Sequence, residues 1–128
     1  MMRWLQRNVF LFDGLGAIGS TAATCTIAVA LQPAFGMPAA TLWALVLLAA
    51  CFVVYSLTCW RRRAPMRPWL PIVMAANLTY CVVLGGALMA HAPALTRLGT
   101  LYFTAEILVI VGVVGLEWTV LRRARDGR

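Results

Sequence analysis

Four long apolar segments dominate the pattern of hydrophobic and polar positions along the chain. They occupy residues 9–31, 41–60, 69–90 and 98–121, and short connections join them. Each has roughly the 20 residues needed to cross a hydrocarbon core of about 30 Å at 1.5 Å per residue. No connection is long enough to fold separately, so residues 1–128 are expected to form one domain. The pattern predicts an all-α, four-helix transmembrane bundle with antiparallel neighbours.

The composition supports a membrane environment for these segments. Of 128 residues, 62% are hydrophobic and 12% are charged, whereas an average soluble domain has about 25% charged residues. A soluble chain of this length would leave much of its apolar surface in water. The lipid bilayer is therefore the first expected partner.

The arginine positions predict how the segments are oriented. Ten of the eleven arginines precede the first segment, separate the second from the third, or follow the fourth, and only Arg97 lies at the other end. Because basic residues collect on the cytoplasmic side, both termini are expected in the cytoplasm. The net charge of +7 therefore reflects the membrane topology of the chain, and we expect no nucleic-acid partner. The first segment is too long for the apolar core of a signal peptide and contains Asp13, so we expect a retained helix.

Four strongly polar side chains lie inside the predicted spans. Asp13, Glu106 and Glu117 are acidic, and Asn77 is a strong hydrogen-bonding group. A charged side chain within a span costs roughly 2.5–3.5 kcal/mol on insertion scales. At 1.5 Å per residue, Asp13 and Glu117 lie roughly 6 Å inside the cytoplasmic edge, and Glu106 lies roughly 22 Å in, past the midplane.

The two shallow carboxyl groups have interfacial explanations. We expect Glu117 to extend towards the interface or to pair with Arg122 or Arg123. Asp13 is close enough to the edge to be hydrated or paired with an arginine, and a functional role is equally open.

Glu106 is harder to explain structurally, because the nearest arginine along the chain, Arg97, is nine residues away. It either lines a wet cavity or is protonated and hydrogen-bonded to another polar side chain. The candidate partners are Tyr80, Thr24 and Tyr102.

Helical spacing gives each segment one polar stripe. In the first segment, four residues lie within about 40° of one line at 100° per residue, namely Asp13, Ala17, Ser20 and Thr24. In the second segment, Cys51 and Tyr55 share a face. Four such stripes can converge on the bundle axis, so the polar side chains should point inward. The candidate residues for a ligand or proton site are Glu106, Asp13, Asn77, Tyr80, Tyr102 and Tyr55.

Small residues in the first segment predict a helix-packing face. Gly16 pairs with Ser20, and Gly19 pairs with Ala23, at the spacing that lets helix backbones approach closely in a membrane. The partner is either another helix of the same chain or a second copy.

Catalytic and metal-binding patterns are weak. The four cysteines all lie within predicted spans without a C-x-x-C pair, so we expect them reduced, as small packing residues. The single histidine, His91, lies in a connection, and no serine or cysteine nucleophile is placed to use it. We therefore expect no cofactor, no metal and no enzymatic activity.

Five strings of residues occur together along the chain. They are LFDGLGA at 11–17, FGMP at 35–38, YS at 55–56, NLTYC at 77–81 and LYFTAEI at 101–107. Together they resemble a family of small four-span bacterial membrane proteins to which no activity is attached. The resemblance implies the same four-helix architecture and transfers no ligand or catalytic residue. The arginine-rich, lysine-free composition is also typical of a GC-rich bacterial genome, so the inner membrane is the expected location.

Three classes of function remain open. The favoured one is a small non-enzymatic membrane protein that binds a hydrophobic or amphiphilic ligand in its bundle, or serves as an accessory subunit of a larger membrane complex. The alternative is a minimal proton- or cation-coupled transporter acting as a homo-oligomer, since small four-span efflux proteins also carry a carboxylate early in their first span. A membrane enzyme or redox protein is the third.

Overall fold

The computed structural model describes residues 1–127, and every element in this range is helical. α1 (Met2–Thr26) continues through a short π-helix, η1 (Ile27–Leu31), into α2 (Gln32–Phe35). Three helices follow, α3 (Ala39–Arg61), α4 (Met66–Ala90) and α5 (Arg97–Asp126). Four helical stretches are long and apolar enough to cross a membrane, the first of them comprising α1, η1 and α2. The prediction of an all-α chain with four potential spans is confirmed.

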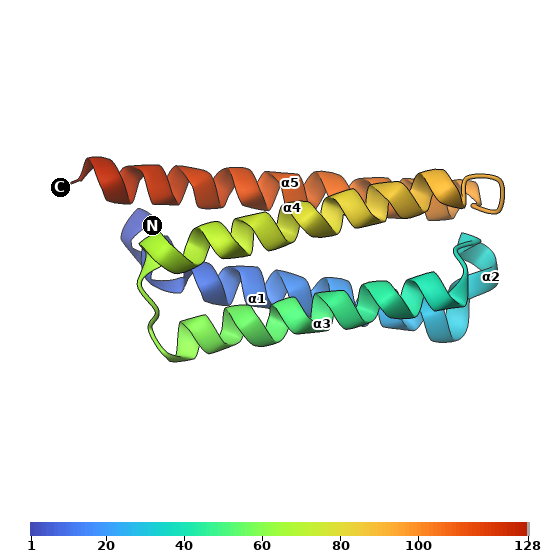
Figure 1. Cartoon of the computed structure of the whole chain (residues 1–128), viewed down its shortest axis with the longest axis horizontal. Helices are drawn as coiled ribbons and strands as arrows, with labels where there is room; N and C mark the ends of the chain where they lie inside the picture. Colours follow the sequence, from blue (N-terminus) through green and yellow to red (C-terminus); the bar gives the residue numbers. More distant parts are fainter. Residues whose placement is uncertain (128) are drawn as a thin grey trace.

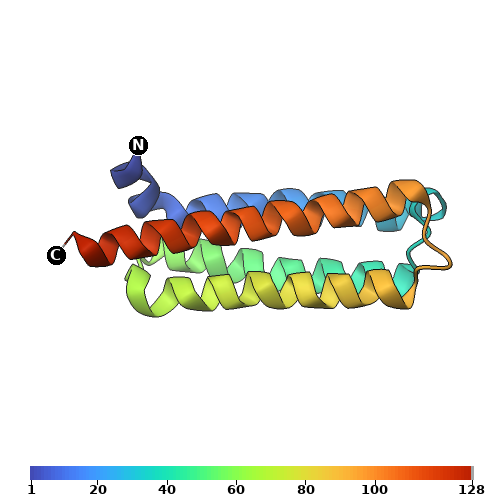
Figure 2. The same ribbon diagram turned by 90° about the horizontal axis from the view of Figure 1, so that it is seen from above.

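The helices are arranged around one interior. Both termini and the α3–α4 connection lie at one end, and α2 and the α4–α5 connection lie at the other (Figure 1). In the second view, α5 lies over α1, and α3 and α4 form the opposite side (Figure 2). Among neighbouring spanning helices, contacts are densest between α1 and α3 and between α4 and α5, and they are sparser between α3 and α4 and between α1 and α5. The α1–α5 side is therefore one of the two loosely packed sides of the bundle.

α1 is broken near its start. Asn8 has φ −122° and ψ 15°, outside the helical region, and its side-chain amide donates to the Trp4 carbonyl at 3.0 Å. The first turns bend away from the rest of the helix (Figure 2). The long part of α1 begins at Val9, where the apolar pattern placed the first span.

The connection between the first two spans begins with a short helix, α2, and residues 36–38 link it to α3. Pro33 lies in the first turn of α2, where its missing N–H removes no intrahelical hydrogen bond. Gly36 ends α2 with φ 79°, a left-handed conformation that glycine adopts without strain. The apolar pattern does not detect this helix, because four residues are too few to show a helical period.

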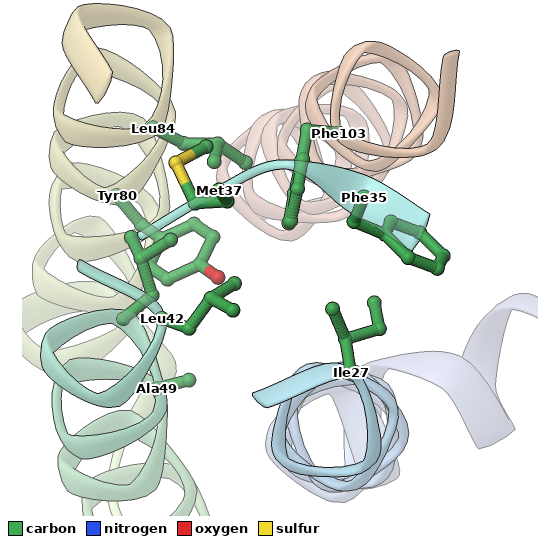
Figure 3. Packing of buried hydrophobic residues seen from close by; sticks show 9 residues of the cluster. Ile27, Phe35, Met37, Leu42, Ala49, Tyr80, Leu84 and Phe103 are labelled. Atoms are coloured by element: carbon green, nitrogen blue, oxygen red, sulfur yellow. The ribbon is translucent and has the colours of Figure 1, made fainter. Parts of the chain in front are cut away.

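Two hydrophobic clusters fill the interior, one towards each end. The cluster towards α2 includes Phe35, Met37, Tyr80 and Phe103, and Figure 3 shows these side chains converging from α2, α4, α5 and the segment after α2. The cluster towards the termini consists of Val9, Phe10, Cys59, Leu70, Val73 and Leu121.

α2 is joined to the start of α5 by close backbone contacts. Thr96 donates its N–H to the Phe35 carbonyl at 3.2 Å and its hydroxyl to the Ala34 carbonyl at 2.6 Å. The same hydroxyl caps α5 by accepting from the Gly99 N–H at 3.0 Å. A Cβ at Gly99 would lie 2.0 Å from the Phe35 carbonyl oxygen, so only glycine permits this approach.

Candidate functional site

Asp13 lies at the centre of a buried hydrogen-bonded group. Its Oδ1 accepts from the side-chain amide of Asn77 on α4 at 2.7 Å, and its Oδ2 accepts from the hydroxyl of Ser56 on α3. Asp13 is only 5% exposed. Gly14 allows α1 and α3 to close on this group, because a Cβ there would lie 2.8 Å from Cδ2 of Leu57.

Glu117 of α5 completes the same layer. Its side chain is 0% exposed, and its carboxyl faces Asp13 and Asn77. Neither carboxyl oxygen has a hydrogen-bond partner within residues 1–127. The expectation that Glu117 extends to the interface or pairs with an arginine is therefore wrong. Glu117 lies eleven residues after Glu106, close to three helical turns, so both side chains project from the same face of α5 into the bundle.

Two members of this layer, Glu117 and Ser56, lie outside the candidate residues predicted from the sequence. The predicted depth of Glu117 equals that of Asp13, and this shared depth is the sequence signal that indicates the pair. Ser56 has no such signal, because a single serine in an apolar helix is not distinctive.

Glu106 belongs to a second polar group, nearer to α2. Its Oε1 accepts from the hydroxyl of Ser20 on α1 and from the hydroxyl of Tyr80 on α4, the latter at 3.2 Å. The predicted contact between Glu106 and Tyr80 is confirmed, and Ser20 is an unforeseen second donor. The buried Oε2 of Glu106 has no hydrogen-bond partner in the described part of the chain.

A cleft of about 750 Å³ runs along the loosely packed side between α1 and α5. Its inner wall carries both polar groups, represented by Asp13, Asn77 and Glu106. The remaining lining is apolar or small, and residues such as Leu15 and Val109 are exposed at the surface of the bundle. The cleft therefore opens sideways, at the level where acyl chains would surround a membrane-spanning bundle.

No family model, curated protein or solved structure matches this chain. The resemblance to small four-span bacterial membrane proteins therefore stays a prediction. A helical bundle hosts many unrelated functions, so the chemistry of the cleft and of its carboxyl groups is the basis for inferring the activity.

Two tyrosines predicted as site residues lie in different places. Tyr102 lines the cleft near Glu106 and packs edge-on against Phe35, with ring centroids 5.5 Å apart. Tyr55 packs against Trp69, with ring centroids 6.2 Å apart, beside the cluster towards the termini. Tyr55 is therefore separate from the cleft.

The polar stripe predicted for the second span is rotated from its expected position. Cys51, which was expected to share the inward face with Tyr55, is exposed. The inward polar residue of α3 is Ser56, because the face of α3 that packs on α1 is set by contact with Gly14.

The small residues of α1 line the cleft. A Cβ at Gly16 or Gly19 would meet no atom within 4 Å, and Ser20 and Ala23 also belong to the lining. The close helix packing predicted for Gly16 and Gly19 is therefore not made within one copy of residues 1–127. α1 makes its close approach to α3 through Gly14, which lies on a different face of the helix.

The cysteines are all free, as expected. Within residues 1–127, no group of three or more His, Cys, Asp or Glu side chains is arranged to hold a metal ion. Nε2 of His91 lies 3.2 Å from the hydroxyl oxygen of Thr41. This hydrogen bond connects the α4–α5 connection to α3.

A second hollow, of about 550 Å³, lies at the end of the bundle that holds the termini. Its lining includes Arg7, Arg61 and Arg63. Guanidinium groups bind phosphate oxygens well, so this hollow has the charge to accept an anionic lipid headgroup at the membrane surface.

Proposed function

We propose that the chain is a non-enzymatic, multi-pass protein of a bacterial inner membrane, and that its cleft binds one amphiphilic molecule taken from the bilayer. In this proposal neighbouring spans are antiparallel and both termini face the cytoplasm, as the arginine distribution predicts. The observation that supports it best is the cleft of about 750 Å³, with apolar walls and Glu106 on its inner side. Ligand sites typically occupy roughly 300–1,000 Å³ and combine apolar walls with a few polar groups.

The polar groups of the cleft indicate the chemistry of the headgroup. Ser20 and Tyr80 both donate to Oε1 of Glu106, and no described residue donates to Oε2. A ligand that carries a hydrogen-bond donor would satisfy this oxygen, and an amine would also balance a carboxylate that is costly to leave unpaired. Gly16 and Gly19 leave space beside it for an apolar chain. We infer a single-chain amphiphile with an amine-bearing headgroup.

One observation favours the alternative, a minimal proton- or cation-coupled transporter acting as a homo-oligomer. Asp13 and Glu106 lie at two levels along the same cleft. Carboxyl groups placed in succession within a membrane are a common feature of ion and proton pathways.

The proposal is tested by titrating the purified protein, in detergent, with a spin-labelled alkylamine. A spin-labelled fatty acid of the same chain length is the charge control, and the alkylamine should bind more tightly. Gly19→Leu places a side chain in the cleft and should weaken alkylamine binding at least about tenfold, or about 1.4 kcal/mol. Gly86→Leu is the matched control, because Gly86 also has nothing within 4 Å of its Cβ but does not line the cleft.

A third variant separates the headgroup from the chain. Glu106→Gln keeps the shape of the cleft and removes the charge, so it should abolish the preference for the amine over the acid. Identical binding by wild type, Gly19→Leu and Gly86→Leu would overturn the cleft as the site. A protein that co-purifies in stoichiometric amount, combined with no probe binding, would support an accessory subunit instead.

A further inference from the structure

The layer of Asp13, Ser56, Asn77 and Glu117 contains two carboxyl groups with very different surroundings. Both oxygens of Asp13 accept hydrogen bonds, from Asn77 and from Ser56. Both oxygens of Glu117 lack a donor among the residues that the structure describes, although its side chain is 0% exposed. The two carboxyl groups face each other, with the Asn77 amide beside them.

We infer that Asp13 and Glu117 form a proton-binding site, in which Glu117 carries the proton and Asp13 is the carboxylate. Ionising both of two adjacent buried carboxyl groups is unfavourable, because each charge disfavours the other. The donors distinguish the two roles. Two hydrogen bonds stabilise a negative charge on Asp13, whereas neither oxygen of the buried Glu117 carboxyl accepts one from residues 1–127.

The described groups that face the pair come from all four spanning helices, and none of them carries a positive charge. Asp13 lies on α1 and Glu117 on α5, while Ser56 of α3 and Asn77 of α4 supply neutral donors. A proton on Glu117 reduces the charge of the layer from two negatives to one. It also gives Glu117 a donor that can reach the Asp13 carboxylate.

The proton can exchange through the cleft. Asp13 and Asn77 line the cleft, whereas Glu117 lies behind them and is not part of the lining. The hydrophobic cluster of Val9, Phe10, Cys59, Leu70, Val73 and Leu121 packs between this layer and the end that holds the termini. On release, the O–H bond of Glu117 breaks, the Asp13 carboxylate that lines the cleft relays the proton to water, and two carboxylates remain. Uptake is the reverse. The site does not depend on whether the cleft also binds an amphiphile.

Infrared spectroscopy of the full chain tests this inference. The protein is purified in a detergent without carbonyl groups and studied in the Glu106→Gln background, which removes the carboxyl group of the second polar group. Solvent-exposed carboxyl groups, with a usual pKa of about 4, are ionised at neutral pH and give no carboxylic acid band. We expect a carboxylic C=O band at neutral pH that shifts in D₂O, disappears as the pH is raised, and is lost in the Glu106→Gln/Glu117→Gln protein.

A second variant is used if circular dichroism shows that the Glu106→Gln/Glu117→Gln protein does not fold. In Glu106→Gln/Asp13→Asn the neighbouring negative charge is gone, so Glu117 should ionise more readily and its band should disappear at lower pH than in Glu106→Gln. An unchanged or higher midpoint would overturn the inference.

Three other results would also overturn it. They are the absence of the band in Glu106→Gln at neutral pH, its persistence in a folded Glu106→Gln/Glu117→Gln protein, and its loss on adding sodium chloride but not choline chloride. The last result would make a sodium ion, instead of a proton, the charge that the pair binds.

Discussion

The side-chain amide of Asn77 lies 2.7 Å from Oδ1 of Asp13, although 64 positions separate the two residues in the chain. Together with the bond from Ser56 to the same carboxyl, this contact ties α1, α3 and α4 at one level of the bundle. Buried polar networks stabilise a fold when their members are satisfied and destabilise it when one partner is lost. This level should therefore be among the most sensitive to substitution.

Replacing Asn77 with leucine should destabilise the bundle by about 1–3 kcal/mol, because Asp13 loses a donor in a buried site. The free energy of unfolding can be measured by titration with sodium dodecyl sulfate in mixed micelles. Thr79→Val is the control on the same helix, since the Thr79 hydroxyl donates only to the Ala75 carbonyl of α4 itself. An equal decrease in the free energy of unfolding in both variants would show that the hydrogen bond between Asn77 and Asp13 does not stabilise the bundle specifically.

Glu106 should respond differently to two substitutions. Glu106→Gln retains an acceptor oxygen for Ser20 and Tyr80, so the free energy of unfolding should change little. Glu106→Leu leaves both hydroxyls without their acceptor and should cost about 1–3 kcal/mol. The same detergent titration distinguishes them, and a leucine variant as stable as the glutamine variant would contradict the role of Glu106 as the shared acceptor.

Gly99 should tolerate no side chain. Gly99→Ala would place a Cβ 2.0 Å from the Phe35 carbonyl oxygen and force α2 and α5 apart, with an expected loss of about 2 kcal/mol or more. Gly112→Ala, on the same helix, meets nothing within 4 Å and should be neutral or stabilising by up to about 1 kcal/mol. The melting temperatures of the two variants can be compared by thermal unfolding in detergent. Similar melting temperatures would show that the α2–α5 contact is not tight.

The orientation of the bundle can be tested with reporter fusions. A reporter that is active only outside the cytoplasm should be active when fused after His91 and inactive at the C-terminus, because ten of eleven arginines lie at the other end from His91. A cytoplasmic reporter should give the reverse pattern. Activity of one reporter at both positions would contradict the four-span topology.

The sequence predicted the helices well because membrane spans have a strong signal. A run of about 20 apolar residues has few alternatives in a chain of this size. The break at Asn8 and the short helix α2 were not predicted, since each depends on one or a few residues with local hydrogen bonds. The apolar pattern still placed the start of the first span at Val9, immediately after the break.

The candidate site was predicted in part, and the errors have one cause. Depth within a membrane follows from position along a helix, so the levels of Asp13 and Glu106 could be estimated. The direction in which a side chain points depends on which helix faces are in contact, and a single sequence gives only a stripe. Glu117 is buried beside Asp13, and Cys51 is exposed, because the packing of α5 and α3 sets their rotation.

The π-helical segment η1 has a consequence for how the length of the chain can vary. Five residues close this stretch with wider turns than an α-helix uses, so it acts as a single-residue insertion between α1 and α2. Deleting one residue from it would turn α2 by about 100°. The Phe35 ring would then no longer pack against Phe103, and the hydrogen bonds from Thr96 to the carbonyls of Ala34 and Phe35 would be lost. Homologous chains should therefore accept many apolar substitutions within η1, yet rarely a change in its number of residues.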